Sequence, residues 1–497
     1  MSLGKTIRPW RALATALSVA VVAMSLSAIP ASAATVNPGT IDGSQTGSIT
    51  VHKYERPSTP TGLPNNGTQV DTTGLTPLAG IDFTIQQVNT IDLTTNAGWQ
   101  SANTLSNAFN PANAAGSITG AGFTLGAGTV KTTVADGTAA FTGLPLGLYL
   151  VTETNYPAGV TPSAPFLVSV PLTDPNNSNA WLYNVHVYPK NSITTATKTV
   201  QDASAVKLGD PVNWTIKGGI PTDAIIDGYK ITDALDSKLT YVGATVTLVD
   251  GTAITAGTDY NVVFDAPSNT VSVVFTPAGR VVLAAHNTTQ VQVVVNTTVN
   301  TIGEIANTAV VYPNAASFTT TPGEPGGPIV TPPVETKWGN ITLEKVNQNG
   351  TALAGASFSV YATAADAKAG TNPVTLGGKT VFTVAANGQL TISGLRYSDF
   401  ANGATVAPGD PAYRTYYLVE TTAPASYELL AAPISFLVTA ATTAVGVDLQ
   451  VKNVPSNSGF ELPFTGGPGT TILYGAGLLI LAGAVLLLVR SRRASNS

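Results

Sequence analysis

Val291-Gln-Val-Val-Val295 is a run of β-branched residues of the kind that forms a β-strand. Phe166-Leu-Val-Ser-Val170 and Ile434-Ser-Phe-Leu-Val438 are runs of the same type, and Pro, Asn, Asp and Gly residues bound all of them. Between the two ends of the chain, no segment shows a sustained helical period. The sequence therefore predicts an all-β protein made of sandwich domains.

The composition also favours strands and turns over helices, because only 10% of the 497 residues are charged while Thr, Ala, Val, Gly and Asn dominate. A chain of this length is too long for one hydrophobic core, so roughly two to four domains are expected. The net charge of −5 comes without a basic stripe, which argues against nucleic acid as a partner. The chain has no cysteine, so disulfides cannot supply its mechanical strength.

The N-terminus has the three parts of a secretory signal peptide. Lys5, Arg8 and Arg11 precede a mostly apolar run over residues 13–29, and Ala31-Ser32-Ala33 follows. We predict that residues 1–33 are a signal peptide cleaved after Ala33. An uncleaved N-terminal membrane anchor is the alternative.

The C-terminus has three parts in the order of a cell-wall sorting signal, which we place at residues 456–497. The pentapeptide is Leu462-Pro463-Phe464-Thr465-Gly466, an uncharged span at 470–489 follows, and three arginines come directly after it. The resemblance implies that a sortase cleaves between Thr465 and Gly466 and holds Thr465 as a thioester. A permanent single-pass membrane protein is the alternative.

Five landmarks occur twice in the same order, which indicates two copies of one domain. In the first copy they are Ile49-Thr-Val-His-Lys53, Leu78-Ala-Gly-x-x-Phe83, Asp136-Gly137 leading to Thr142-Gly-Leu144, Glu153-Thr-x-x-Pro157-Ala, and Lys190-Asn191. In the second they are Ile341-Thr-Leu-Glu-Lys345, Leu353-Ala-Gly-x-x-Phe358, Asn387-Gly388 leading to Ser393-Gly-Leu395, Glu420-Thr-x-x-Pro424-Ala, and Lys452-Asn453. The first copy carries an Asn/Ala/Gly-rich insertion at 94–130, which we predict to be a surface loop.

Trp181-x-x-x-Val185-x-Val187-Tyr188-Pro189-Lys190 matches every defined position of the pilin motif. With the sorting signal, the chain resembles the major pilins of Gram-positive bacteria, particularly actinobacterial fimbrial shaft proteins, over essentially its whole length. The resemblance implies three tandem immunoglobulin-like β-sandwich domains that are similar to the B-type, A-type and B-type repeats of collagen adhesins. We place these domains at 34–191, 192–320 and 337–455, with a Pro/Gly linker at 321–336. In the family, the motif lysine attacks the thioester, which would join Lys190 of one subunit to Thr465 of the next.

The last domain also resembles the family's self-forming isopeptide site. There Lys345 would attack the side-chain carbonyl of Asn453, while a protonated Glu420 polarises that carbonyl and ammonia leaves. Burial would produce the neutral lysine and the neutral acid that this reaction needs. Ser426 stands where the family has Gly, which puts the turn after the acid in doubt. A buried salt bridge without reaction is the alternative.

The other two domains carry matching sets of residues. In the middle domain they are Lys198, Asp233 and Asn307, with Asp227 and Asp236 as alternative acids; in the first they are Lys53, Glu153 and Asn191. In the first domain Val151 and Tyr156 stand where the family has Leu and Ala. The sequence therefore does not decide whether this domain forms its internal bond.

We therefore predict the shaft subunit of a cell-wall-anchored pilus. A monomeric wall-anchored adhesin is the alternative. The expected partners of the shaft subunit are a pilin-specific sortase, a housekeeping sortase with peptidoglycan, copies of itself, tip or base pilins, and a host or bacterial receptor. An enzyme is not expected beyond single-turnover self-crosslinking, because His52, His186 and His286 lack metal-ligand spacing and no cofactor motif occurs.

Overall fold

The computed structural model describes residues 40–444 and 446–456. The predicted signal peptide, the pentapeptide at 462–466 and the apolar span at 470–489 lie outside these residues. Within the described ranges, no helix has both the length and the apolar character needed to cross a membrane. Two compact units are present: one holds the described residues up to Asp202 with Pro211–Thr298 and Ile305–Thr336, and the other holds Ala203–Asp210, Val299–Glu304 and the described residues from Lys337 onward.

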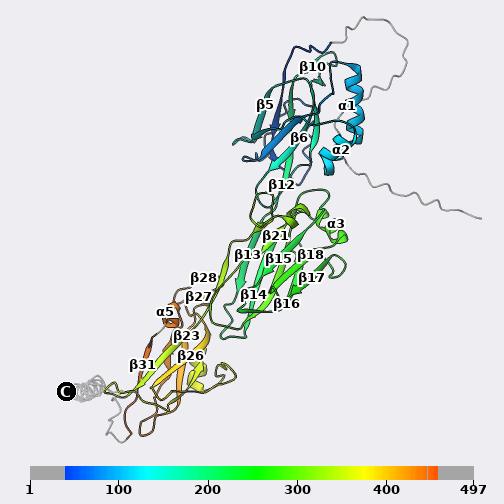
Figure 1. Cartoon of the computed structure of the whole chain (residues 1–497). Helices are drawn as coiled ribbons and strands as arrows, with labels where there is room; N and C mark the ends of the chain where they lie inside the picture. Colours follow the sequence, from blue (N-terminus) through cyan, green and yellow to red (C-terminus); the bar gives the residue numbers. More distant parts are fainter. Residues whose placement is uncertain (1–39, 445, 457–497) are drawn as a thin grey trace, which may run out of the picture. The chain divides into compact units, whose positions relative to one another are not determined.

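Residues 47–193 form a β-sandwich around one apolar core (Figure 1). Its strands are β1 (Gly47–His52), β2 (Tyr54–Glu55), β3 (Asp82–Gln87), β4 (Thr129–Thr132), β5 (Thr138–Leu144), β6 (Gly147–Asn155), β7 (Val160–Thr161), β8 (Phe166–Val170), β9 (Leu172–Thr173), β10 (Trp181–Leu182), β11 (Asn184–Val187) and β12 (Lys190–Ile193). The two main sheets have the orders β11-β1-β5 and β4-β3-β6-β8. Ile49 and Val51 of β1 meet Phe83 of β3 and Val151 of β6 in the core, because alternate residues of a strand face the same side.

The insertion at 94–130 is helical over much of its length, so the prediction of a surface loop was wrong there. It contains α1 (Asn96–Ala108), a short 3₁₀ helix η1 (Pro111–Asn113) and α2 (Ala114–Gly120), and it ends in β4. The Thr95 side chain caps α1 by accepting a hydrogen bond from the Gly98 amide. Leu105 of α1 and Ile118 of α2 are fully buried in an apolar cluster with Leu148 of β6. The helices form because they cover the second face of the β3-containing sheet, which local sequence pattern cannot show.

Residues 196–330 contain two further sheets, with the orders β13-β14-β19-β16 and β17-β18-β15-β21-β22. The strands are β13 (Ala196–Gln201), β14 (Pro211–Gly219), β15 (Lys230–Ala234), β16 (Leu239–Leu248), β17 (Tyr260–Asp265), β18 (Thr270–Phe275), β19 (Gln290–Val299), β20 (Gly303–Asn307), β21 (Val310–Tyr312) and β22 (Ile329–Val330), with α3 (Pro277–Ala285) and η2 (Ala316–Thr319) between them. The β14 residues Val212, Trp214 and Ile216 alternate into the core. Strand β22 lies within the stretch expected to be a linker.

The remaining elements lie in residues 334–452, and this range belongs to the second unit from Lys337 onward. The elements are β23 (Val334–Val346), β24 (Ser357–Tyr361), α4 (Ala364–Ala369), β25 (Phe382–Thr383), β26 (Gln389–Arg396), β27 (Phe400–Ala401), β28 (Ala404–Thr405), β29 (Tyr416–Thr422), β30 (Ile434–Phe436), α5 (Ala440–Thr443) and β31 (Leu449–Lys452). β23 pairs with β26 and β31, and the second sheet has the order β25-β24-β29-β30. The apolar core of this region includes residues that flank Lys345, Glu420 and Asn453 in the sequence: Ile341, Leu343, Tyr416, Leu418 and Val451.

The strand registers of the first and last regions are equivalent. Strand β1 runs parallel to β11, and β23 runs parallel to β31. Phe83 pairs with Glu153 across β3 and β6, and Phe358 pairs with Glu420 across β24 and β29. Ser426 has a φ of 69°, a left-handed conformation that glycine adopts without strain, which explains why glycine suits this turn. The turn forms with serine in that place.

Candidate functional site

The first cluster brings Lys53, Glu153 and Asn191 together. Lys53 lies between β1 and β2, Glu153 lies in β6, and Asn191 lies in β12. Lys53 Nζ is 2.8 Å from Glu153 Oε2 and also donates a hydrogen bond to Asn191 Oδ1. Asn191 Nδ2 donates to Glu153 Oε1. All three side chains are buried, so the amine, the acid and the amide contact each other away from water.

The third cluster repeats this arrangement with Lys345 on β23, Glu420 on β29 and Asn453 just after β31. Lys345 Nζ donates to Asn453 Oδ1, and it forms an ion pair of 3.4 Å with Glu420 Oε1. Asn453 Nδ2 donates to both Glu420 oxygens, at 3.0 and 2.9 Å. The lysine therefore approaches the amide oxygen while the acid holds the amide nitrogen.

The middle cluster brings together Lys198 on β13, Asp233 on β15 and Asn307 at the end of β20. Lys198 Nζ lies 2.7 Å from Asp233 Oδ2, and Asn307 Nδ2 donates to the same oxygen at 3.4 Å. Asp233 Oδ1 and Asn307 Oδ1 are buried without a hydrogen-bond partner. An unpaired carboxylate oxygen in this setting favours the protonated acid, because burial penalises the ionised form.

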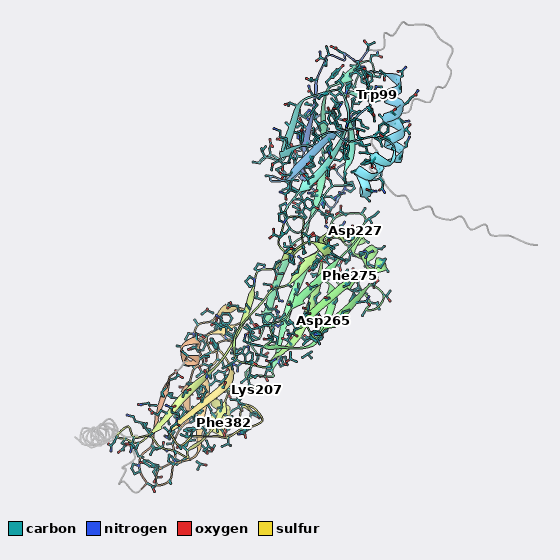
Figure 2. The ribbon with its side chains drawn as sticks, in the orientation of Figure 1. Trp99, Lys207, Asp227, Asp265, Phe275 and Phe382 are labelled. Atoms are coloured by element: carbon teal, nitrogen blue, oxygen red, sulfur yellow. The ribbon has the colours of Figure 1, made fainter. Side chains whose placement is uncertain are left out.

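The structure separates Asp233 from the two other acids that the sequence left open. Asp236 Oδ1 lies 3.4 Å from Lys238 Nζ at a partly exposed position. Asp227, labelled in Figure 2, accepts a hydrogen bond from the Ala315 amide. Asp233 is the acid that contacts Lys198.

Burial shifts the pKa of the three cluster lysines and of Asp233 in the direction that amide formation needs. It lowers the pKa of Lys53 to about 8, against the opposing effect of the Glu153 charge. It likewise lowers the pKa of Lys198 to about 8 and that of Lys345, and it raises the pKa of Asp233. Removing water disfavours the charged form of both the amine and the acid.

The low pKa of Lys53 predicts a pH-dependent stability in the Asn191→Ala variant, which leaves the amine unreacted. The pKa is about 8 in the folded protein against an ordinary value of 10.5. Between these values the unfolded chain binds more protons than the folded one, so the free energy of unfolding should rise with pH, and it should level off outside that window. Urea denaturation across the window measures this slope. A Lys53→Met, Asn191→Ala double variant should lose it, and equal slopes in both variants would contradict the low pKa.

Lys190 is the first residue of β12 and pairs in register with Tyr54 of β2. Its half-buried side chain donates from Nζ to the Tyr188 carbonyl at 3.3 Å. Burial lowers the pKa of Lys190, and the nearby Arg56 charge lowers it further. The amine is therefore both reachable and easier to deprotonate than an ordinary lysine.

The other motif residues build the support for Lys190. Val185 and Val187 face the core and pair with Ile49 and Val51 of β1. The centroid of the Trp181 ring lies 5.5 Å from that of the Trp99 ring on α1, and Figure 2 labels Trp99. The motif thus fixes the strand that leads to the lysine.

Three contacts in the first sandwich and at its edge could not be read from the sequence. Arg56 Nη2 donates to the Lys190 carbonyl at 3.3 Å, and Arg56 Nε lies 3.2 Å from Asp223 Oδ1. His52 Nε2 lies 2.8 Å from His186 Nδ1, although these residues are far apart in the sequence. The parallel pairing of β1 with β11 brings the two histidines together, and no local sequence motif predicts this contact.

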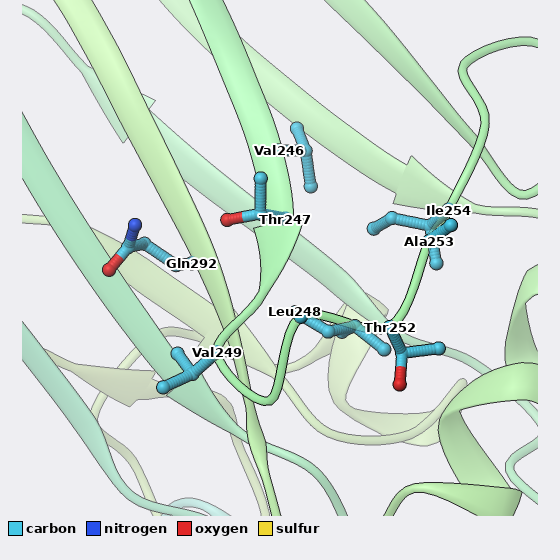
Figure 3. A pocket seen from close by; sticks show the side chains of 9 residues that line it. Val246, Thr247, Leu248, Val249, Thr252, Ala253, Ile254 and Gln292 are labelled. Atoms are coloured by element: carbon cyan, nitrogen blue, oxygen red, sulfur yellow. The ribbon is translucent and has the colours of Figure 1, made fainter.

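A pocket of about 470 Å³ lies beside β16, lined by residues that include Val246, Leu248, Thr252, Ile254 and Gln292 (Figure 3). None of the residues of the three clusters, nor Lys190, lines it. Among residues 40–444 and 446–456, no three His, Asp or Glu side chains gather as a metal site requires.

Comparison with known proteins matches most of these regions to families. Residues 44–192 match the N-terminal domain D1 of Gram-positive pilin subunits, 339–453 match a prealbumin-like fold domain, and 454–496 match the LPXTG cell wall anchor motif. Fimbrial subunit type 1 of Actinomyces viscosus is 34% identical over 529 aligned positions, with 97% of each chain covered.

The solved structures of two major pilins from Corynebacterium diphtheriae share the fold. The full-length major pilin SpaD has a TM-score of 0.67 and 27% identity, covering 84% of this chain and all of that one (100%). The major pilin SpaA has a TM-score of 0.60 and 28% identity, covering 82% of this chain and 100% of its own.

A multi-domain, immunoglobulin-like β fold that carries a wall-anchor motif defines a cell-wall-anchored surface protein. The chain belongs to the fimbrial subunit family, the sortase-assembled major pilins of Gram-positive bacteria. It is a structural subunit of the pilus shaft at the cell surface, so the predicted class, all-β fold and location are confirmed.

Proposed function

We propose that a pilin-specific sortase polymerises this subunit by joining Lys190 of one copy to Thr465 of the next, and that internal Lys–Asn bonds stabilise each copy. A housekeeping sortase would attach the finished polymer to peptidoglycan, and tip or base pilins would complete it. Thr465 lies outside the described residues. The half-buried amine of Lys190 at the start of β12 supports its role as the nucleophile.

The internal bonds follow from one observation: in each of the three clusters, a buried lysine contacts a buried acid that also accepts a hydrogen bond from an asparagine amide. A proton moves from the ammonium to the carboxylate, and the neutral Nζ attacks Cγ of the asparagine. The Cγ–Nδ2 bond then breaks, and Nδ2 leaves as ammonia with a proton taken from Nζ. Each site is consumed in the reaction, so the protein is not an enzyme in the ordinary sense.

The bonds would carry load along the chain. Lys53 and Asn191 are 138 positions apart in the sequence, and Lys345 and Asn453 are 108 apart. In each pair the first strand of a sandwich would be tied to its last, so tension would pass through covalent bonds rather than separate the strands. An amide also resists reduction, which accounts for stability without cysteine. The assignment of sandwich domains to 34–191, 192–320 and 337–455 is part of this proposal.

The mass of the secreted protein tests the internal bonds. We expect it to lie three ammonias below the mass calculated for the residues that remain after signal-peptide cleavage, once all three clusters have reacted. A Lys53→Met, Lys198→Met, Lys345→Met variant should show the full mass calculated for its own retained residues. A wild-type protein at the full calculated mass would overturn the proposal.

A further inference from the structure

Lys190 is held in place by Arg56, the residue that follows β2. The backbone N–H of Arg56 donates to the Asn191 carbonyl at 2.7 Å, and its Nη2 donates to the Lys190 carbonyl at 3.3 Å. These bonds extend the pairing of β2 with β12, in which Lys190 pairs with Tyr54. Arg56 therefore contacts β12 at the residue that carries the amine and at the residue after it.

Arg56 is held in turn by the loop between β14 and β15. Its Nε forms an ion pair of 3.2 Å with Asp223 Oδ1, and Asp223 is the less exposed of the two side chains. The other carboxylate oxygen of Asp223 accepts a hydrogen bond from the Ser192 hydroxyl at 2.6 Å. Thr222 Oγ1 donates to the Arg56 carbonyl at 3.3 Å and lies 3.0 Å from Ser192 Oγ. Two neighbouring loop residues thus contact both β12 and the arginine that supports it.

Arg56 also acts on the Lys190 amine through its charge. Burial lowers the pKa of Lys190, and the positive charge of Arg56 lowers it further. Lys53 and Lys190 are close enough for their charges to repel each other as well. Glu55 on β2 and Asp223 are the acids of these segments, and an acid that acted on the amine directly would raise its pKa instead.

We propose that Asp223 is a positioning residue for the joining of subunits, because it holds Arg56 against the segment that presents Lys190. The inference rests on the proposed junction at Lys190. In that step the ammonium first loses a proton to solvent, and Nζ then forms a bond to the carbonyl carbon of Thr465. The bond from that carbon to the sortase sulfur breaks, and a second proton of Nζ leaves with the thiol. A fixed, neutral amine is the species that this attack needs.

Competitive amine labelling tests the proposal on intact cells that lack the pilin sortase, where full-length subunits keep Lys190 free. Limiting acetic anhydride is applied from about pH 7 to about pH 11, a range in which aspartate is ionised. Mass spectrometry then gives the labelling midpoint of Lys190, with Lys131 of the same molecules as reference. In Arg56→Gln the midpoint should rise by roughly half a unit to one unit, about a three- to tenfold loss of neutral amine. Arg56→Lys keeps the charge and should restore the wild-type midpoint.

Asp223→Asn separates positioning from simple electrostatics. Asparagine can still accept the Ser192 hydrogen bond, but it has no charge to hold Arg56. Loss of a negative charge alone would lower the midpoint of Lys190, whereas release of Arg56 should raise it. The Arg56→Gln, Asp223→Asn double variant should match Arg56→Gln alone, because the acid acts through the arginine. Asp236→Asn makes the same change at an acid of another ion pair, and it should leave the midpoint unchanged.

The growth of the high-mass ladder in cells that contain the sortase is the second readout. Arg56→Gln and Asp223→Asn should each slow it about fivefold, and the double variant should be no slower than Arg56→Gln. Asp236→Asn should polymerise at the wild-type rate.

A midpoint that falls or stays in place in Asp223→Asn would overturn the positioning role. If that variant does not fold, Arg56→Gln and Arg56→Lys decide the matter, and equal midpoints in these two would reject the proposal. A ladder that persists in Lys190→Arg means that the junction lies elsewhere, so the proposed function fails together with this inference. A ladder lost in Lys190→Arg with unchanged midpoints in the Arg56 and Asp223 variants rejects this inference alone.

Discussion

Replacing Lys190 with arginine should abolish the covalent polymer, so that cell-wall extracts show single subunits in place of a high-mass ladder on a denaturing gel. Arginine keeps the positive charge and much of the side-chain length, but its guanidinium stays protonated and cannot attack a thioester. The half-buried Lys190 amine, by contrast, has a pKa lowered by burial and by Arg56. The expected loss of polymer is essentially complete, because each junction needs this amine.

Lys131→Arg is the matched control, since Lys131 is an exposed lysine on β4 of the same sandwich. That variant should retain the ladder at the wild-type level. A ladder that persists in Lys190→Arg would assign the junction to another lysine. A wild-type protein found only as single subunits would favour the monomeric adhesin instead.

Replacing Glu420 with glutamine should prevent the third internal bond and cause the second large effect. Glutamine has nearly the same shape, but it cannot take the proton that Lys345 must lose before its Nζ attacks Asn453. By analogy with a disulfide that closes a loop of this length, losing the bond removes about 4–5 kcal/mol from the stability of that domain. The melting temperature of the domain should therefore fall on the order of 15–20 °C.

Calorimetry and intact mass together check this prediction. The protein should lose one ammonia fewer than wild type, with the change confined to the Lys345–Asn453 peptide. Glu344→Gln is the control, because it makes the same chemical change at the residue that precedes Lys345. Glu344 accepts a hydrogen bond from Gln450 at 2.9 Å on the surface. In this variant the crosslink should form and the melting temperature should stay at the wild-type value. An intact crosslink in Glu420→Gln would show that this acid is dispensable.

The fold could be predicted from the sequence because strand pattern is a local property. The runs that end at Val170, Val295 and Val438 are rich in β-branched and aromatic residues, which favour β-strands. The structure places these runs in or beside β8, β19 and β30. The helices at 96–120 could not be predicted in this way. Their apolar residues are few, and the helices are stabilised by burying Leu105 and Ile118 against the β3-containing sheet.

The amino-acid sequence by itself determined the lysines, acids and asparagines of the candidate sites, the motif around Lys190 and the repeat that relates two of the sandwiches. Only the tertiary structure decided which groups meet. It selected Asp233 over Asp227 and Asp236 as the partner of Lys198, and it brought Arg56 to the carbonyl of Lys190 and the carboxylate of Asp223. The physical reason is that strand pattern is set by neighbours in the chain, whereas hydrogen bonds between distant residues are set by the register of strands that pair only after the core has formed.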